Sequence, residues 1–254
     1  MYIETTNSTN TLLRELLAKG AWPEGERYVR TDYQTAGRGQ TGNGWESEKG
    51  KNLLCSIVLA VSRWPLAVGS FALNVAVSVA VHKTISQALK AKSQELTIKW
   101  PNDIYWGNRK IAGILIENAL VGSEVKYSIA GIGLNVNQTE WLSDAPNPVS
   151  LKQITGETYD LDELMQGLLE ELEKVEPEDA WAYYKAHLYR RDSFWPFVER
   201  EVNTTPTMNA NAQAQGQFLA RIADVLPSGE IVLIDQQNQQ RNYHFKQIRY
   251  VVEI

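Results

Sequence analysis

The segment TAGRGQTGNGWE, residues 35–46, decides which fold the sequence indicates. Gly37, Gly39 and Gly42 stand in the spacing G-x-G-x-x-G, which is typical of a dinucleotide-binding loop. Such a loop runs directly into a helix, and an acidic residue follows about 20 positions later at the end of the next strand. Here the glycines lead into NGWESEKGKN, which has no helical periodicity, and the next strand, NLLCSIVLAVSRW, carries no acidic residue. The sequence therefore argues against a dinucleotide site.

The same loop carries a second set of residues with ligand-binding chemistry: Gln34, Arg38, Gln40, Asn43 and Trp45. Glycines let backbone N–H groups approach an anion, a guanidinium pairs with phosphate or carboxylate, and an indole ring offers a face for stacking. Taken alone, the loop indicates either a nucleotide-phosphate site or a surface hairpin whose glycines only turn the chain.

Composition and charge limit the class of protein. The 254 residues are 43% hydrophobic and 22% charged, which predicts one main globular domain plus a small one. Because the formal charge is −5, a dedicated nucleic-acid binder is disfavoured. No apolar run reaches about 18 residues, and MYIETTNSTN lacks the features of a secretion signal, so we expect a cytoplasmic chain without membrane partners.

The cysteine and the histidines do not indicate a metal centre. Cys55 is the only cysteine and lies in an apolar run, so we expect a buried thiol. His82, His187 and His244 lie far apart, without the Cys or His spacing of a zinc site. Any metal is therefore expected to arrive with a substrate.

Hydrophobic periodicity predicts alternating helices and strands. Helices are expected at 8–20, 67–89, 160–175 and 178–191. Strands are expected at 28–36, 51–61, 95–100, 110–120 and 125–136, with turns at Gly107–Asn108 and 121–123. Residues 204–216 read as a loop, and beyond them alternating apolar residues predict a small β-barrel or sandwich with strands around 218–222, 231–233, 243–245 and 248–252.

Two further segments combine glycines with polar residues at strand ends. KWPNDIYWGNRKIAGILIE, residues 99–117, places polar residues beside a turn and Gly113 inside a strand, where a missing side chain often marks a close approach to the backbone. AGIGLNVN, residues 130–137, repeats this pattern. Three such clusters in one chain indicate a shared cleft.

The order of these motifs resembles the biotin–protein ligase family. The matching motifs are STN at 8–10, GRGxxGxxW at 37–45, KWPND at 99–103, RKIAGILIE at 109–117 and GIGLNVN at 131–137. The resemblance implies an α+β fold with a mixed, mostly antiparallel sheet flanked by helices, similar to class II synthetases. It also implies a catalytic domain at residues 1–190 and a small SH3-like β-barrel at residues 191–254.

The resemblance implies an ATP-dependent ligase that acts in two steps. Biotin and ATP with Mg²⁺ would form biotinyl-5′-adenylate and release pyrophosphate, and a lysine of a biotin carboxyl carrier protein would then attack the adenylate. The catalytic residues implied are Lys110, Arg38 and Asp103, and none is a metal ligand. Biotin is expected against Ser8, Thr9, Asn10, Gln34, Gly37, Arg38, Gly39, Gln40, Lys110, Gly113 and Gly131. ATP is expected against Arg38, Trp45, Lys99, Asn102, Lys110 and Asn135.

These residue types suit that chemistry. A carboxylate and a phosphate at ~4 Å repel by about 1 kcal/mol in water and by more where water is excluded, so cations such as Lys110 and Arg38 are needed between them. The ureido ring of biotin needs hydrogen-bond partners, which the resemblance assigns to Ser8, Thr9 and Gln34. Other roles stay open, because Ser8 and Thr9 are also good helix caps and an Asp after Pro-Asn is also a common turn former.

Two features set this sequence apart from many members of the family. Gln40 stands where those members have a second arginine, so retention of the adenylate is expected to depend on loop ordering over the product. The STN motif begins at residue 8, so we expect no N-terminal helix-turn-helix domain and no operator binding. A lipoate–protein ligase and a non-catalytic biotin-binding module are the alternative functions. Lipoate–protein ligases lack the motifs GRGxxGxxW and KWPND, and a non-catalytic biotin-binding module would not need Lys110.

Overall fold

The computed structural model describes residues 1–40, 44–59, 71–121, 124–143, 147–200 and 216–251. Several sequence predictions lie wholly or partly outside these ranges. They are Gly42 and Asn43 of the loop, the end of the strand expected at 51–61, the start of the helix expected at 67–89, the turn at 121–123, the loop at 204–216 and the strand end at Val252.

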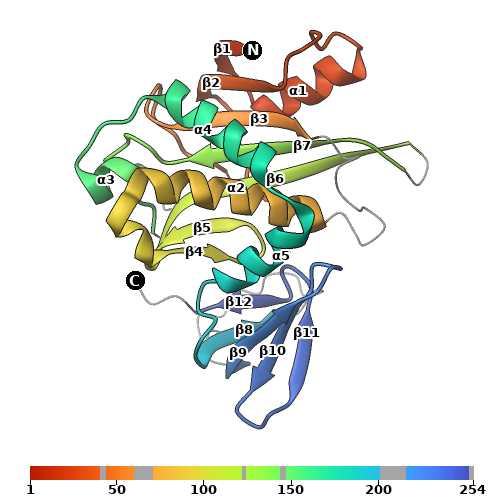
Figure 1. Cartoon of the computed structure of the whole chain (residues 1–254), viewed down its shortest axis with the longest axis vertical. Helices are drawn as coiled ribbons and strands as arrows, with labels where there is room; N and C mark the ends of the chain where they lie inside the picture. The colour runs from red at the N-terminus through yellow and green to blue at the C-terminus, as the bar shows by residue number, and fades with distance from the viewer. Residues whose placement is uncertain (41–43, 60–70, 122–123, 144–146, 201–215, 252–254) are drawn as a thin grey trace.

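A seven-stranded sheet forms the larger part of the molecule (Figure 1). Its strands are β1 (Tyr2–Thr6), β2 (Tyr28–Gln34), β3 (Leu53–Leu59), β4 (Leu96–Lys99), β5 (Asp103–Trp106), β6 (Arg109–Val121) and β7 (Glu124–Leu134). The spatial order is β1-β2-β3-β7-β6-β5-β4. Only β1 and β2 run parallel, and the other neighbours are antiparallel. The predicted mixed, mostly antiparallel sheet is confirmed.

Helices pack on both faces of this sheet. They are α1 (Thr9–Ala18), α2 (Phe71–Leu89), the 3-10 helix η3 (Lys90–Glu95), α3 (Leu151–Thr155), α4 (Leu161–Lys174) and α5 (Pro177–Ala186). Helix α2 is apolar on nearly all sides because α4 and α5 cover it from outside and the sheet lies beneath it (Figure 1). Helix α1 packs on the opposite face, where Leu13 meets Val29 and Ile129. Because side chains alternate along each strand, half of them point to the face that α2 covers and half to the opposite face. Helix α1 covers only part of that opposite face, and the remainder can hold a site.

A second, five-stranded antiparallel sheet follows at the C-terminal end. Its strands are β8 (Trp195–Glu199), β9 (Gln217–Val225), β10 (Ile231–Asp235), β11 (Gln240–Tyr243) and β12 (Ile248–Tyr250), in the order β11-β10-β9-β8-β12. It is consistent with the SH3-like barrel that the sequence predicts. The Trp100 indole N–H donates to the carbonyl of Gly229 at 3.0 Å, and Lys185 pairs with Asp224 at 2.6 Å, so the second sheet is anchored to the first part.

Several differences from the sequence expectations have identifiable causes. Strands β1, β5 and β8 and helix α3 were not predicted, because each is only 4 or 5 residues long. Helix α5 ends at Ala186 rather than continuing to 191, because the next residues hydrogen-bond to strand β4. The Ile98 N–H donates to the carbonyl of His187 at 2.7 Å, and the Tyr189 N–H donates to the carbonyl of Ile98 at 2.9 Å. These bonds pair backbone groups at the edge of the sheet. If the helix continued, the N–H and carbonyl groups of the edge strand β4 would lack these partners.

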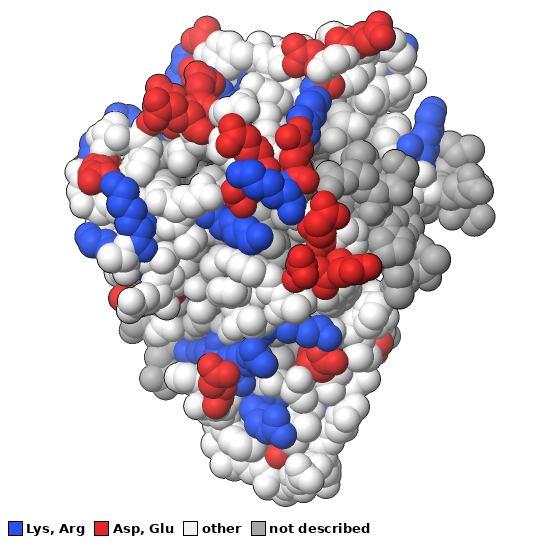
Figure 2. All heavy atoms as spheres, viewed as in Figure 1, with Lys and Arg blue, Asp and Glu red and all other residues white. Residues whose placement is uncertain are grey.

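Surface charge does not gather into a single-sign face on the side that carries α2, α4 and α5. Figure 2 shows basic and acidic side chains interspersed there. Among the described residues, no helix is long and apolar enough to cross a membrane.

His82 makes the folded protein sensitive to acid. The side chain is buried in α2, with Nε2 at 3.2 Å from the Leu96 carbonyl and Nδ1 at 3.0 Å from the Tyr183 hydroxyl. The carbonyl can only accept, so Nε2 carries the proton, and the neutral ring satisfies both partners. Burial lowers the pKa of His82 to about 4, although the hydrogen bond with the Leu96 carbonyl raises it in part.

Because unfolded histidine binds a proton near pH 6.5, the unfolding free energy should fall between pH 6.5 and 4, by about 3 kcal/mol in all. Urea unfolding at several pH values measures this slope, and His82→Gln should flatten it. The control is His244→Gln, since that side chain is 64% exposed. Equal slopes in wild type and His82→Gln would contradict the prediction.

Candidate functional site

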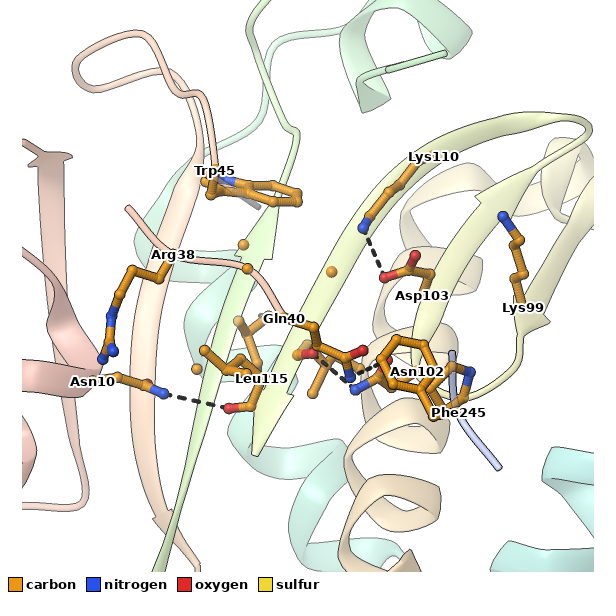
Figure 3. A pocket seen from close by; sticks show the side chains of 18 of the residues that line it. Asn10, Arg38, Gln40, Trp45, Lys99, Asn102, Asp103, Lys110, Leu115 and Phe245 are labelled. Atoms are coloured by element: carbon orange, nitrogen blue, oxygen red, sulfur yellow. Dashed lines mark hydrogen bonds and ion pairs between the residues drawn. The ribbon is translucent and has the colours of Figure 1, made fainter. Parts of the chain in front are cut away.

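Strand register places four motif residues in one row. Gly133 of β7 lies opposite Gly113 of β6, Gly113 opposite Asp103 of β5, and Asp103 opposite Lys99 of β4. Residues directly opposite each other in a sheet point to the same face. The row therefore runs across four strands, with two glycines at one end and two charged side chains at the other, on the face that α2 does not cover (Figure 3).

A β-bulge turns Lys110 toward this row. The register shifts between Ile104 and Tyr105, so that Ile111 is an extra residue in β6. Ile111 and Ala112 are both fully buried in the core, although neighbours in a regular strand point to opposite faces. The extra residue returns Lys110 to the site face, where its ammonium pairs with Asp103 at 2.7 Å.

Lys99 lies beside this pair in a less polar setting. Its ammonium donates to the Tyr105 hydroxyl at 3.0 Å and lies 5.3 Å from the ring centre of Tyr250 in the second sheet. Burial lowers the pKa of Lys99 to about 8. The charge of Lys110 also lowers this pKa, whereas the charge of Asp103 raises it. An anionic ligand near this amine would favour its protonated form.

A buried polar cluster lies where α1 meets β2 and β3. Gln34 Oε1 accepts from the backbone N–H and the hydroxyl of Thr9, at 2.8 and 3.1 Å. The Ser56 hydroxyl lies 2.7 Å from Thr9 Oγ1 and 2.5 Å from Asn10 Oδ1. Ser8 occupies the N-cap position of α1, but its side chain makes no capping hydrogen bond. The STN motif thus forms a network with the sheet in addition to starting a helix.

Gly131 gives Asn10 its place in this cluster. A Cβ atom at Gly131 would lie 2.4 Å from Asn10 Oδ1, so a larger residue would displace the asparagine. The Asn10 amide donates to Glu117 Oε2 at 2.8 Å. The backbone space at Gly131 is therefore used by a side chain of the chain itself.

The glycine loop reaches both ends of the site. Gln40 donates to Asn102 Oδ1 at 3.0 Å, and the Asn102 amide donates to the carbonyl of Ile114 at 2.9 Å. Arg38 pairs with Glu117 at 3.4 Å and points toward Asn10, away from Lys110 (Figure 3). The structure therefore brings Asp103 to Lys110, but it does not bring the Arg38 guanidinium there.

Trp45 lies flat against the strand glycines. A Cβ atom at Gly133 would meet its Cε2 at 2.4 Å, and one at Gly113 would meet its Cζ3 at 3.0 Å. The Lys110 ammonium lies 5.7 Å from the indole centre. The glycines at these positions admit an aromatic ring to the row of charged residues.

Two adjoining cavities contain all the predicted site residues. The first is lined by Ser8, Thr9, Asn10, Gln34, Arg38, Gly39, Gln40, Trp45, Lys99, Asn102, Asp103, Lys110, Gly113 and Gly131. The second is lined by Gly37 and Asn135, and it shares Gln34, Trp45, Asp103 and Lys110 with the first. Among the described residues, no group of three or more His, Cys, Asp or Glu side chains could hold a metal ion.

Asn135 acts on the backbone beside Lys110. Its amide donates to the carbonyls of Val149 and Lys110 at 3.1 and 3.4 Å, and its Oδ1 is buried without a hydrogen-bond partner among the described residues. The Lys110 backbone also pairs with the segment that contains Pro148. Asn135 thus supports the strand that carries the lysine.

Sequence reasoning missed the residues that the second sheet contributes. The first cavity is also lined by Arg200, Phe245, Lys246, Arg249 and Tyr250. Phe245 was expected in a strand, but β11 ends at Tyr243, and the ring projects 43% exposed from a turn into the cavity (Figure 3). No motif marks these positions. For buried Ser56, which was also missed, a polar residue inside an apolar strand was an available signal.

The cavity is strongly cationic in an acidic chain. Among the described residues that line it, the cationic side chains are Arg38, Lys99, Lys110, Arg200, Lys246 and Arg249, and the one acidic side chain is Asp103. The positive charge gathered there fits a ligand with several negative charges.

Sequence similarity identifies the family of this chain. A sequence model of the biotin/lipoate A/B protein ligase family matches residues 2–135. The chain is 35% identical over 178 residues to the bifunctional ligase/repressor BirA of Bacillus subtilis, covering 66% of this chain and 51% of the relative. It is 32% identical over 171 residues to the biotin–acetyl-CoA-carboxylase ligase of Mycobacterium tuberculosis, covering 67% and 61%. The matches thus span between about half and three fifths of these relatives.

Solved structures extend the similarity to the whole chain. The biotin protein ligase from Aquifex aeolicus in complex with biotin and ATP aligns over 98% of both chains, with a TM-score of 0.73 and 19% identity. The biotin protein ligase from Leishmania major in complex with biotinyl-5-AMP aligns over 96% of this chain and 97% of that one, with a TM-score of 0.63 and 18% identity. At these identities the similarity shows the fold. With the family match over residues 2–135, the chain belongs to the biotin/lipoate A/B protein ligase family.

Proposed function

We propose that this chain is an ATP-dependent biotin–protein ligase that acts in the cytoplasm. It would join biotin to AMP and then transfer biotin to a lysine of a biotin carboxyl carrier protein. The observation that carries the proposal is the row Gly133–Gly113–Asp103–Lys99, with Lys110 turned onto it by the bulge. The relatives named as biotin ligases and the neighbour solved with biotin and ATP support it. The expected lack of binding to nucleic acid and membranes stays a prediction.

In the first step a biotin carboxylate oxygen attacks the α-phosphorus, and the bond from that phosphorus to the oxygen bridging to the β-phosphorus breaks. Lys110 would lie between the two anions and stabilise the charge that develops on the α-phosphate. Lys99 and the cations of the second sheet, Arg200, Lys246 and Arg249, would stabilise the departing pyrophosphate. Mg²⁺ would arrive with ATP and supply further charge neutralisation.

In the second step the acceptor lysine amine attacks the acyl carbon and AMP leaves. Asp103 is the acid group of the row, so it would orient that amine and accept its proton. Asp103 pairs with Lys110 at 2.7 Å. A phosphate beside Lys110 would compete for the ammonium, which would free the carboxylate for the amine.

Biotin would lie near the cluster of Thr9, Asn10, Gln34 and Ser56. These side chains offer the donors and acceptors that a planar ureido group requires, next to the strand glycines. Arg38 would serve the phosphate only after leaving Glu117, so its catalytic role depends on a rearrangement.

The decisive test offers the protein biotin or lipoate with MgATP and measures pyrophosphate release. Labelled biotin is then followed into a carrier domain. Release with biotin, followed by labelling of the carrier lysine, supports the proposal. Pyrophosphate release with lipoate but not with biotin would make the chain a lipoate–protein ligase. Biotin binding without any release would make it a non-catalytic module.

Gly131→Ala should weaken biotin binding. The new Cβ would approach Asn10 Oδ1 to 2.4 Å, so Asn10 must move out of the polar cluster. We expect the KM for biotin to rise about tenfold, because about one to two hydrogen bonds would be lost. The KM for ATP should stay within about twofold. Gly167→Ala is the control, since a Cβ there meets nothing within 4 Å. A KM for biotin equal to that of the wild type would contradict the prediction.

A further inference from the structure

The glycine loop is tied to a second segment by Glu46, a residue that none of the motifs includes. Glu46 Oε1 accepts from the Leu142 N–H at 2.7 Å, and Oε2 accepts from the Ser143 N–H at 2.9 Å. One carboxylate thus binds two successive backbone donors. Burial alone would raise the pKa of Glu46, but hydrogen bonds from the Ser143 side chain and from these two N–H groups outweigh it and lower the pKa. The group is therefore a carboxylate at neutral pH.

The other end of the same segment is held independently. Gln138 Oε1 accepts from the Glu48 N–H at 2.9 Å and from the Asn52 amide at 2.6 Å. The Val136 N–H donates to Asn52 Oδ1 at 2.9 Å. Residues 136–143 are therefore attached to the glycine loop and its return at two places, with Trp141 between them.

Trp141 owes its position to these two attachments. It lines the second cavity together with Trp45, Asn135 and Lys110. The indole nitrogens of Trp45 and Trp141 are both buried without a hydrogen-bond partner among the described residues. Leu142, the next residue, is 94% exposed, so burial of its own side chain does not fix the segment. Glu46 binds the two residues that follow Trp141, and Gln153 donates to the Thr139 carbonyl on the other side of it at 3.0 Å.

We infer that Glu46 is a positioning residue for the nucleotide: by holding Leu142 and Ser143 it fixes Trp141 as a wall of the cavity that Trp45, Asn135 and Lys110 line. This inference rests on the proposed function and deepens it. Gln40 reaches the cavity and binds Asn102, but it carries no charge that could retain the adenylate. A fixed aromatic wall compensates by slowing its escape.

The experiment compares Glu46→Ala and Glu46→Gln with the wild type. Glu46→Ala removes two charge-assisted hydrogen bonds at a partly exposed site, so the KM for ATP and the rate of adenylate release without carrier should each rise about tenfold. The KM for biotin should not change, and kcat should stay within about twofold. Glu46→Gln keeps one acceptor oxygen and should lie between alanine and the wild type. Glu48→Gln is the matched control, since its exposed side chain makes no ion pair with the described residues.

An unchanged KM for ATP together with unchanged adenylate release would overturn the inference. So would an equal rise in the KM for both substrates, which would indicate general damage to the fold. Equilibrium dialysis with ATP gives a second readout that does not depend on turnover. If the wild type forms no adenylate but Glu46→Ala still binds ATP about tenfold more weakly, the proposed function fails and the role of Glu46 stands.

Discussion

Replacing Lys110 by alanine is expected to slow adenylate formation by about 100- to 1000-fold, the usual effect of removing one preorganised charge from a transition state. The ammonium pairs with Asp103 at 2.7 Å and lies 5.7 Å from the ring of Trp45, so it stands between the predicted positions of biotin and nucleotide. Exchange of labelled pyrophosphate into ATP, dependent on biotin, measures this step without a carrier protein.

The neighbour of Lys110 provides the control. Arg109 belongs to the same strand, but its guanidinium lies 5.0 Å from the ring centre of Trp106, and Trp106 does not line either cavity. Arg109→Ala should therefore leave exchange within about twofold of the wild type. Lys110→Met keeps the apolar stem and should be as slow as alanine, which separates lost charge from lost packing. Exchange by Lys110→Ala within threefold of the wild type would remove the lysine from the catalytic assignment.

Asp103→Asn is expected to act on the second step. Asparagine keeps the shape of the side chain but cannot accept the proton of the acceptor amine, so transfer from preformed biotinyl-adenylate should slow by about 100-fold. Pyrophosphate exchange should change less than fivefold, because Lys110 remains. Single-turnover transfer to a carrier domain, followed by labelled biotin, separates the two steps.

A second Asp–Lys pair serves as the matched control. Asp224 pairs with Lys185 at 2.6 Å, between α5 and β9, and neither side chain lines the cavities. Asp224→Asn should not affect transfer, because the hydrogen bond from Trp100 to the Gly229 carbonyl still anchors the second sheet. If Asp103→Asn slowed exchange and transfer equally, Asp103 would be a support for Lys110 rather than the group that receives the amine.

The sequence predicted the local parts of the fold and site because their signals are local. Alternating apolar residues located most strands, and the glycine and KWPND motifs indicated a shared cleft. Helix α4 begins at Leu161, within the helix expected at 160–175, and Oδ1 of the preceding Asp160 accepts from the N–H groups of Asp162 and Glu163 at 2.8 and 3.0 Å. A capping box at Ser150 and Gln153 was an equally local signal for α3 that was not used.

The remainder depends on contacts between distant segments. Nothing in one sequence sets Gly113 opposite both Gly133 and Asp103, since register comes from the packing of the whole sheet. The contribution of Arg249 comes from a strand far along the chain, after a stretch without motifs. The motifs also did not indicate that Arg38 would bind Glu117, because the two residues lie 79 positions apart in the sequence.

The extra residue in β6 has a consequence for how this chain can vary. Because side chains alternate from face to face, the number of residues between Lys110 and Gly113 decides whether the ammonium meets the row of site residues or the hydrophobic interior. A chain that kept Lys110 and Gly113 but lost Ile111 would turn the ammonium toward the interior. The spacing between this lysine and this glycine therefore matters to the site as much as the lysine itself.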